Sequence, residues 1–254
     1  MVAIADYGAG NITSVENILR AVGAEYVLAG SPRDFARAAG IILPGVGAFG
    51  AAAASLRASG LFGALRAAAA DGVPFLGICL GLQLLFESSE ESPGAEGLGL
   101  IGGRVIRLAA AGKKIPHIGW TSIDIAKRGR ILSSVKDGEF FYFVHSYGAQ
   151  STERGAVAAT ADYGGVFDAC VERGNIFGCQ FHPEKSGAAG RKIIVNFLDM
   201  CGGRGAALPN AEKGGAAGSA NAGTTGVARS ANAGISGAAD SANAAAEGRV
   251  KNER

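Results

Sequence analysis

A short apolar run that ends in a glycine-flanked cysteine constrains the fold of this chain more than any other stretch. Residues 73–78 are almost entirely apolar, and Cys79 follows inside a Gly-x-Cys-x-Gly pattern formed with Gly77 and Gly81. This pattern predicts a buried strand, a sharp turn and an amphipathic helix, which is a nucleophile elbow that carries a thiol. The glycines suit a strained turn packed against backbone. Cys79 would lie at a helix N-terminus, where the dipole favours a thiolate.

The same motif, taken alone, is equally consistent with a structural cysteine in a β-α unit. Free cysteine is among the most buried residue types. Two glycines four residues apart are also common where a helix packs closely on a sheet. The choice between nucleophile and core residue therefore depends on the other motifs of the chain.

Apolar segments alternate with helical segments in the first half of the sequence. Thr13 or Ser14 can cap a first helix with apolar positions at the 3.6-residue period, and Gly23 would end it. Residues 49–70 are helical in character, with a break near Gly60. Strands are expected at 2–5, 26–29, 41–43 and 73–78. Strands that alternate with helices predict a parallel sheet with right-handed crossovers.

After residue 92 the pattern changes to strands in hairpin-like succession. The expected segments are 103–108, 114–125, 139–145, 156–161, 167–172 and 175–181, and a last helix covers 190–200. The predicted fold class is α/β, with a mostly parallel central sheet flanked by helices and additional antiparallel strands.

The C-terminal region has a different composition from the rest. Residues 203–254 are mostly Ala, Gly, Ser and Asn, contain no Phe, Trp or Tyr, and repeat Ser-Ala-Asn-Ala at 219, 230 and 241. Such a segment cannot bury enough apolar surface to offset its ordering entropy. We expect a folded domain over 1–202 and a disordered low-complexity tail over 203–254. The folded part is near neutral, so no nucleic-acid partner is expected.

The cysteines and the apolar runs indicate no metal site and no membrane segment. The four cysteines at 79, 170, 179 and 201 have neither Cys-x-x-Cys nor another metal-ligand spacing. The N-terminus lacks a basic region followed by a long apolar stretch, and no apolar run reaches the roughly 18 residues of a membrane span. We expect a cytoplasmic protein that needs no cofactor.

A candidate base for the thiol lies near the end of the expected domain. His182 precedes Pro183, which keeps the local chain extended. Residues two apart in an extended segment point to the same side, so His182 and Glu184 should project together. This suits Cys79 as nucleophile, His182 as base and later acid, and Glu184 as the carboxylate that orients the ring. A surface His-Glu pair at a strand end is the alternative.

A glycine turn after the third strand is a candidate oxyanion site. Pro44-Gly45-Val46-Gly47 follows an expected parallel strand, and active sites gather at the carboxyl ends of such strands. The glycines leave the backbone free to direct an N–H at an oxyanion, and the residue after the nucleophile, Leu80, would supply a second N–H. A plain tight turn fits Pro44–Gly47 equally well. A phosphate loop is disfavoured, because its Lys and Ser/Thr are missing.

These motifs together resemble the class I, triad-type glutamine amidotransferase domain, over residues 1–200. The resemblance rests on Pro-Gly-Val-Gly at 44–47, Gly-Ile-Cys-Leu-Gly-Leu-Gln at 77–83 and Gln-Phe-His-Pro-Glu at 180–184. Further stretches are similar to the branch that supplies ammonia for imidazole glycerol phosphate formation in histidine biosynthesis: 6–11, 43–49, 116–120, 142–147 and 181–186. The tail has no counterpart in the family pattern.

The resemblance implies a reaction, a partner and further site residues. It implies that Cys79 forms a glutamyl thioester and that ammonia passes to a cyclase subunit, a (β/α)8 barrel that forms a heterodimer with this chain. It places bound glutamine against Gly45, Val46, Gly47, Leu80 and Gln83. It places the partner interface at or near Asn11, Trp120, Tyr142 and Lys185, and an exposed Trp suits an interface. Core packing is the alternative for Trp120. His117 and His145 are assigned no catalytic role.

Three other functions stay open at this stage. The chain could be a class I subunit for anthranilate, pyridoxal phosphate or purine synthesis, although the Asp-Tyr-Gly-Ala-Gly-Asn opening at 6–11 favours the first interpretation. It could be a γ-glutamyl hydrolase or cysteine peptidase of similar fold. It could also be an interaction subunit without activity, which the presence of Cys79, His182 and Glu184 argues against.

Overall fold

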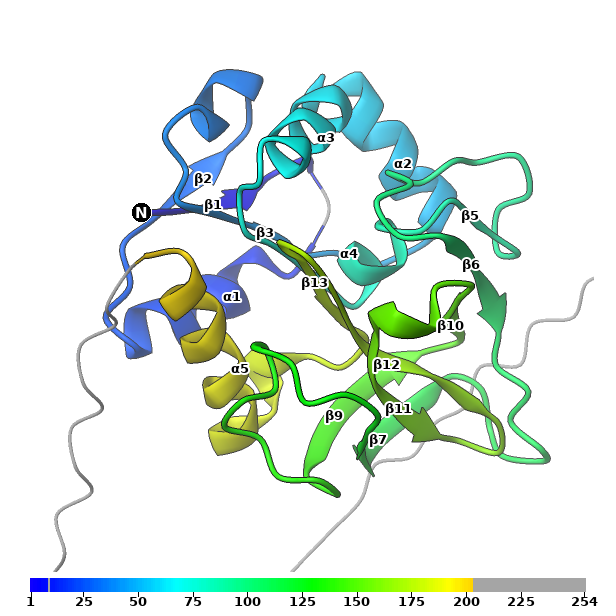
Figure 1. Ribbon diagram of the computed structural model, residues 1–254. Helices are drawn as coiled ribbons and strands as arrows, with labels where there is room; N and C mark the ends of the chain where they lie inside the picture. The colour runs from blue at the N-terminus through cyan, green and yellow to red at the C-terminus, as the bar shows by residue number, and fades with distance from the viewer. Residues whose placement is uncertain (9, 203–254) are drawn as a thin grey trace, which may run out of the picture. The chain divides into compact units, whose positions relative to one another are not determined.

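The computed structural model describes residues 1–8 and 10–202 (Figure 1). The expected tail, 203–254, lies outside the described residues. Among those described, none of the helices combines the length and the apolar character needed to cross a bilayer. The fold class is the expected one: helices flank a large sheet that is parallel in one half and mostly antiparallel in the other.

The parallel half of the sheet follows the predicted strands closely. The strand order through the large sheet is β2-β1-β3-β4-β13-β12-β10-β6-β5. Its parallel members are β1 (Val2–Ala5), β2 (Tyr26–Ala29), β3 (Gly40–Leu43), β4 (Phe75–Ile78) and β13 (Ile176–Cys179). Every residue of β1, β3, β4 and β13 is buried. Continuous apolar runs are typical of strands covered on both faces.

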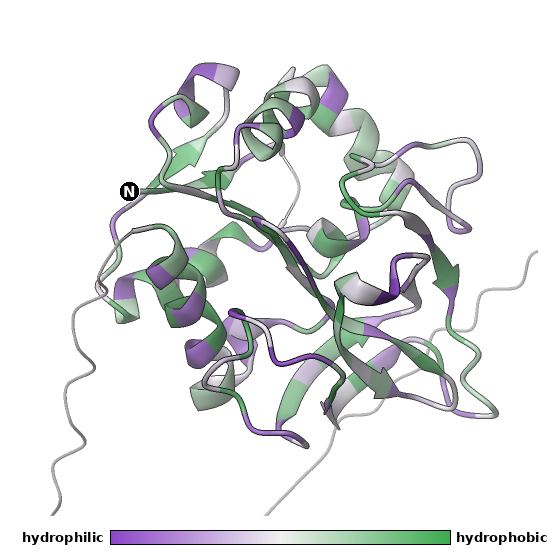
Figure 2. Cartoon of the chain, in the orientation of Figure 1, coloured by the Kyte–Doolittle hydropathy of each residue, from purple (hydrophilic) through white to green (hydrophobic). Residues whose placement is uncertain are grey.

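Two apolar layers cover this half of the sheet. Because side chains alternate across a strand, Ile4 and Ile42 pack with α1 (Ile12–Ala21) and α5 (Gly187–Met200), whereas Ala3 and Ile41 pack with α2 (Phe49–Ala58) and α3 (Leu61–Ala70). The helices lie on the two sides of the strands in Figure 1, and the middle strands are hydrophobic along most of their length (Figure 2). The sheet is therefore a rigid platform for its strand ends.

The helix boundaries correct one expectation and confirm another. The first helix begins at Ile12 with Asn11 as its N-cap, so neither Thr13 nor Ser14 caps it. Ser14 instead donates a hydrogen bond from Oγ to Asn11 Oδ1 at 2.9 Å. The expected break near Gly60 is confirmed, because Gly60 has the left-handed backbone that separates α2 from α3. Glycine reaches that conformation without a steric penalty.

The expected hairpin succession after residue 92 is only partly right. Segment 114–125 pairs with 139–145, 156–161 with 167–172, and 167–172 with 175–181, but 103–108 does not pair with 114–125, nor 139–145 with 156–161. β6 (Gly103–Arg107) pairs with β10 (Tyr147–Ser151), while β7 (His117–Ser122) pairs with β9 (Phe140–His145) in a separate two-stranded sheet. β10 and β5 (Ser88–Ser89) were not expected. The other elements are β8 (Asp124–Ile125), β11 (Val157–Asp162), β12 (Val166–Arg173) and the short 3-10 turns Pro32–Phe35, Arg154–Ala156 and Pro183–Lys185.

The two-stranded β7–β9 sheet has one buried and one open face. His117, Phe143 and His145 lie on the buried face. Ile118, Trp120 and Phe140 lie on the other, with 60%, 54% and 57% of their surfaces exposed. The alternative of core packing for Trp120 is therefore wrong. We call Ile118, Trp120 and Phe140, together with the half-buried Tyr142, the open ribbon face.

Candidate active site

The turn after β4 holds Cys79 in a strained conformation. Its φ is 54° and its ψ is −108°, and positive φ is uncommon for a residue with a Cβ. The turn is tightly packed at both of its glycines. A Cβ on Gly77 would lie 2.6 Å from the Gly81 carbonyl oxygen, and a Cβ on Gly81 would overlap the Leu43 carbonyl oxygen of neighbouring β3. Cys79 N–H also donates to the Cys179 carbonyl at 2.8 Å. This over-determined geometry is that of a nucleophile elbow.

The helix after the elbow is shorter than expected. α4 covers only Leu80–Gln83, and the residues that follow, Leu84, Leu85 and Phe86, are fully buried. The expectation of an amphipathic helix is wrong, because this apolar run lies inside the core and has no solvent face. A single turn aligns few peptide dipoles, so the helix contributes less to a thiolate than the sequence indicated.

His182 and Glu184 meet directly, although the backbone between them is not extended. His182 caps the 3-10 turn Pro183–Lys185, and its Nδ1 lies 2.7 Å from Glu184 Oε1. Their side chains are 2% and 1% exposed. His182 N–H donates to the Tyr142 carbonyl, and Ser186 Oγ donates to the His182 carbonyl. Two hydrogen bonds therefore hold the His182 backbone, and Glu184 orients the ring through Nδ1.

The environment of His182 favours the protonated ring. Burial lowers the pKa of His182, but the Cys79 thiol and the Glu184 carboxylate outweigh it and raise that pKa to about 9. Nε2 is buried and makes no hydrogen bond of ordinary geometry within residues 1–8 and 10–202. Among the groups that raise the pKa of His182, Cys79 has the largest effect. Because Nδ1 is bonded to Glu184, Nε2 is the ring atom that can exchange a proton with the Cys79 thiol.

The Pro44–Gly47 turn stands beside the thiol and is packed at one end only. A Cβ on Gly45 would lie 2.8 Å from Tyr7 Oη, which itself donates to the Pro44 carbonyl at 2.9 Å. Gly45 thus packs beneath the turn, and it does not line the cavity that contains Cys79. Val46 is 44% exposed, and Gly47 has a φ of 97° with open space around it. The turn presents Val46 and Gly47 to the thiol.

A cavity of about 270 Å³ joins these groups. Its lining includes the predicted Val46, Gly47, Cys79, Leu80, Gln83 and His182. Its remaining lining residues were not predicted to lie in the site, although all but the first belong to the quoted stretches 116–120 and 142–147: Glu91, Pro116, Val144, His145, Ser146 and Tyr147. Glu91 had no signal in the sequence, because its carboxylate caps α2 through the Phe49 N–H at 2.7 Å, a long-range contact. The volume suits a small metabolite.

Gln83 and Gln180 form a buried amide pair at the base of this cavity. Gln83 Nε2 donates to the Tyr147 carbonyl at 2.8 Å and to Gln180 Oε1 at 3.1 Å. Gln180 Nε2 lies 3.6 Å from Cys79 Sγ. Only Oε1 of Gln83 is left for a ligand. The sequence reasoning did not single out Gln180, although its position two residues before His182 places both side chains on one side of an extended chain.

The other two histidines form a buried, neutral pair. His145 Nδ1 donates to the Tyr147 carbonyl at 2.8 Å, and His145 Nε2 lies 3.1 Å from His117 Nδ1. Thr121 Oγ1 donates to His117 Nε2 at 2.9 Å. Burial lowers the pKa of His117 to about 4 and that of His145 to about 3. Both rings stay uncharged near neutral pH and hold the β7–β9 sheet against the cavity.

The residues expected at a partner interface lie on neighbouring surfaces. The rings of Trp120 and Tyr142 meet edge to face at 6.1 Å, and Lys185 Nζ lies 6.0 Å from the Tyr142 ring. Lys185 is exposed and stands in the same 3-10 turn as Glu184. Asn11 caps α1, which packs against that turn. Because His182 N–H donates to the Tyr142 carbonyl, the open ribbon face adjoins the segment that carries His182.

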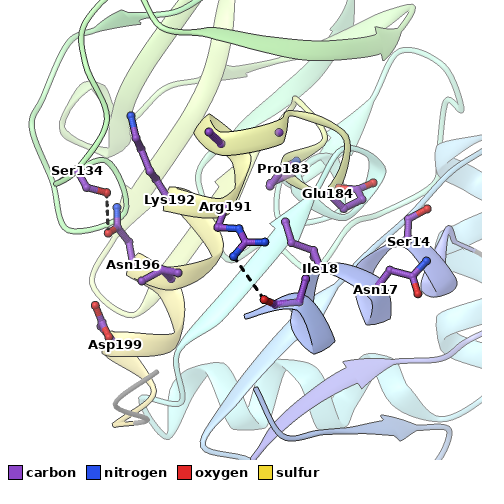
Figure 3. Close-up of a pocket in the computed structure, with 14 residues that line it drawn as sticks. Ser14, Asn17, Ile18, Ser134, Pro183, Glu184, Arg191, Lys192, Asn196 and Asp199 are labelled. Carbon is purple, nitrogen blue, oxygen red and sulfur yellow. Dashed lines mark hydrogen bonds between the residues drawn. The ribbon is translucent and has the colours of Figure 1, made fainter. Parts of the chain in front are cut away.

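A larger hollow between α1 and α5 does not reach the thiol. It measures about 1010 Å³ and is lined by side chains of both helices (Figure 3). It approaches the site only at Pro183 and Glu184, and the Glu184 side chain is 1% exposed, so the carboxylate is sealed from it. Arg191 spans the two helices by donating to the Ala21 carbonyl at 3.4 Å.

Comparisons with known proteins point to one family. The model of the family described as glutamine amidotransferase class-I matches residues 3–201. The imidazole glycerol phosphate synthase subunit HisH of Methanothermobacter thermautotrophicus is 48% identical over 200 residues, covering 79% of this chain and 98% of that protein. The subunit of the same name from Desulfitobacterium hafniense Y51 is 48% identical over 197 residues, covering 78% and 93%.

Solved structures with lower identity share the fold. One described as a glutamine amidotransferase superposes with a TM-score of 0.63 at 18% identity, over 80% of this chain and all of that chain. PurLQS from Thermotoga maritima superposes with a TM-score of 0.63 at 21% identity, over 78% of this chain and 97% of that chain. These likenesses concern the architecture of residues 1–202.

Proposed function

The chain belongs to the class I glutamine amidotransferases, and from that premise we propose that it is the glutamine-hydrolysing subunit of an imidazole glycerol phosphate synthase. The observation that carries the activity is the meeting of Cys79 on its strained turn with the His182–Glu184 pair in one cavity. The pathway rests on identities of 48% over almost the full length of relatives that carry this name.

The proposed reaction proceeds through a thioester. The Cys79 thiolate attacks the side-chain carboxamide carbon of glutamine, so that a C–S bond forms and the carbonyl oxygen becomes an oxyanion. His182 Nε2 gives its proton to the amide nitrogen, the C–N bond breaks and ammonia leaves. Water then attacks the thioester while neutral His182 takes a proton from it. The C–S bond breaks, which releases glutamate and restores the thiolate and the imidazolium.

Backbone N–H groups would stabilise the two oxyanions of this reaction. Leu80 follows the nucleophile, and Val46 and Gly47 line the opposite wall of the same cavity. N–H groups held at such positions are worth several kcal/mol in acyl transfer (roughly 3–4 for one donor). Gln83 Oε1 remains as an acceptor for a substrate N–H. Gly45 would act indirectly, by seating the turn against Tyr7.

The proposed partner is a cyclase subunit of (β/α)8-barrel fold that forms a heterodimer with this chain and uses the ammonia. The open ribbon face supports such a partner, because exposed apolar side chains in a cluster are typical of protein interfaces. Asn11, Trp120, Tyr142 and Lys185 are the proposed interface residues. A cytoplasmic location, where soluble metabolites are available to both subunits, completes the proposal.

The decisive experiment measures glutamate release from glutamine by the full chain, with and without the cyclase and its ribulosyl-type ligand. We expect strong stimulation by both together. Cys79→Ala should lower the rate roughly 10⁴-fold or more while leaving partner binding intact. Absence of stimulation would reject the pathway, and activity in Cys79→Ala would reject the catalytic assignment. Release of glutamate from γ-glutamyl peptides would instead indicate a γ-glutamyl hydrolase.

A further inference from the structure

Gln180 lies in an extended segment that also carries His182. The segment follows β13, and Gln180 N–H donates to the Ala169 carbonyl at 2.9 Å. Because side chains alternate in such a segment, Gln180 and His182 both face Cys79. Phe181 between them faces the core and stacks on Phe141, with ring centroids 4.0 Å apart. Two polar side chains of one segment therefore converge on one sulfur.

The orientation of the Gln180 amide follows from its neighbours. The Tyr147 carbonyl oxygen can only accept hydrogen bonds, so the group of Gln83 that faces it, 2.8 Å away, is the NH₂. The second hydrogen of that NH₂ is directed at Gln180, 3.1 Å away, which must present its carbonyl oxygen. The NH₂ of Gln180 is then left to face Cys79 Sγ at 3.6 Å.

We propose that Gln180 is a further catalytic residue, whose amide N–H donates to the Cys79 sulfur and stabilises it as a thiolate, and that Gln83 is the positioning residue that fixes this amide. The proposal deepens the proposed function, on which its catalytic meaning rests. Gln180 has no exposed surface, and hydrogen bonds to an ionised group are strongest where water is excluded.

The N–H contact acts on the sulfur whenever the sulfur is charged. It stabilises the thiolate before attack, and it stabilises the same thiolate as the leaving group when water opens the thioester. A donor to the charged form of a group favours that form. Gln180 thus assists both halves of the reaction without transferring a proton.

Alkylation of Cys79 by iodoacetamide tests the contact directly, because the thiolate is the reactive form and neither glutamine nor the partner is needed. The rate at the Cys79 peptide is followed by mass spectrometry from pH 5 to 10, which separates it from the other three cysteines. Gln180→Met keeps the side-chain length and removes the donor. The exposed Gln150→Met on β10 is the matched control.

We expect Gln180→Met to slow alkylation at pH 7 about 10-fold and to move the inflection of the pH profile up by about one unit, since a hydrogen bond to a charged group is worth about that much. Gln180→Glu, close to isosteric, should slow it further by placing a carboxylate beside the sulfur. Gln83→Leu should move the profile in the same direction by less. Gln150→Met should leave it unchanged.

The proposal is overturned if folded Gln180→Met and Gln180→Glu both give the wild-type profile. Should Gln180→Met fail to fold, Gln180→Leu, which also removes the donor, takes its place, because the added charge alone would slow Gln180→Glu. An unmoved profile in Gln83→Leu removes the positioning role of Gln83. A shifted profile in a chain that releases no glutamate from glutamine would reject the proposed function and leave the thiolate contact in place, so the two failures are distinguishable.

Discussion

Two turns line the cavity that contains the Cys79 thiol, and they differ in how closely the rest of the fold packs against them. The Cys79 turn follows β4 and the Pro44–Gly47 turn follows its parallel neighbour β3, with Leu43 beside Gly77 in the register. Backbone atoms pack closely against the Cys79 turn at both of its glycines, Gly77 and Gly81. The other turn is seated at Pro44 and Gly45, against Tyr7, while Val46 is exposed and Gly47 has open space around it. The fold itself therefore positions Cys79 and Leu80, whereas the direction of the proposed N–H donors of Val46 and Gly47 depends on a local backbone conformation.

Gly81→Ala should have the largest effect on this comparison. The new Cβ would overlap the Leu43 carbonyl oxygen, and α4 and β3 would have to move apart to admit it. We expect the free energy of unfolding to fall by about 3 kcal/mol or more, measured by urea denaturation.

Gly63→Ala is the matched control, because Gly63 is exposed within α3 and has open space around it. It should raise the free energy of unfolding by about 0.5–1 kcal/mol. A wild-type midpoint in Gly81→Ala would mean that the Cys79 turn is not held by steric enclosure.

The protonation of His182 gives an effect of intermediate size. Its pKa is raised to about 9, so the ring keeps the proton that ammonia release needs up to that pH and loses it above. We expect kcat/KM for glutamine to fall about tenfold per pH unit above pH 9.

Titration by NMR can follow His182 directly, because the other two histidines titrate near pH 4 and 3. In Cys79→Ala the pKa of His182 should decrease, since the thiol is one of the groups that raises it. An unchanged value would contradict the contact between this ring and Cys79.

Gly47→Ala should have the smallest effect on folding. An alanine at a φ of 97° costs about 1–2 kcal/mol of strain but meets no neighbour. We expect a loss of that size in urea denaturation, roughly a 10-fold lower glutamine turnover from a misdirected N–H, and an unchanged rate of Cys79 alkylation. A loss of stability as large as that of Gly81→Ala would show that the two turns are equally constrained.

The sequence predicted best the features whose cause is local. The strands β1 to β4 are continuous apolar runs, and Gly60 by itself indicates the break between α2 and α3. The strand β10 was missed because Tyr147-Gly148-Ala149-Gln150-Ser151 has no β-branched run and is a strand only through its pairing with β6. The helix after Cys79 was overestimated because an apolar run inside the core gives no period by which to judge its length.

The site shows the same division between local and long-range causes. Cys79, His182 and Glu184 could be predicted from short motifs, because the Gly-x-Cys-x-Gly pattern and the His-Pro-Glu sequence each lie within five consecutive residues. The contact of Gln180 with Cys79 depends on β13 lying beside β4. Position 81 must be glycine because a Cβ there would overlap the Leu43 carbonyl oxygen of β3. Neither follows from the sequence without the strand order.

The overlap that a Cβ on Gly81 would make with Leu43 has a consequence for protein engineering. The pentapeptide Gly77–Gly81 cannot by itself confer a strained thiol on another scaffold, because part of the packing that holds it comes from Leu43 of β3. A graft would have to carry β3 and β4 in register together with the segment after β13 that supplies Gln180 and His182. The transferable unit is therefore the set of three neighbouring strands β3, β4 and β13, whose segments are far apart in the sequence.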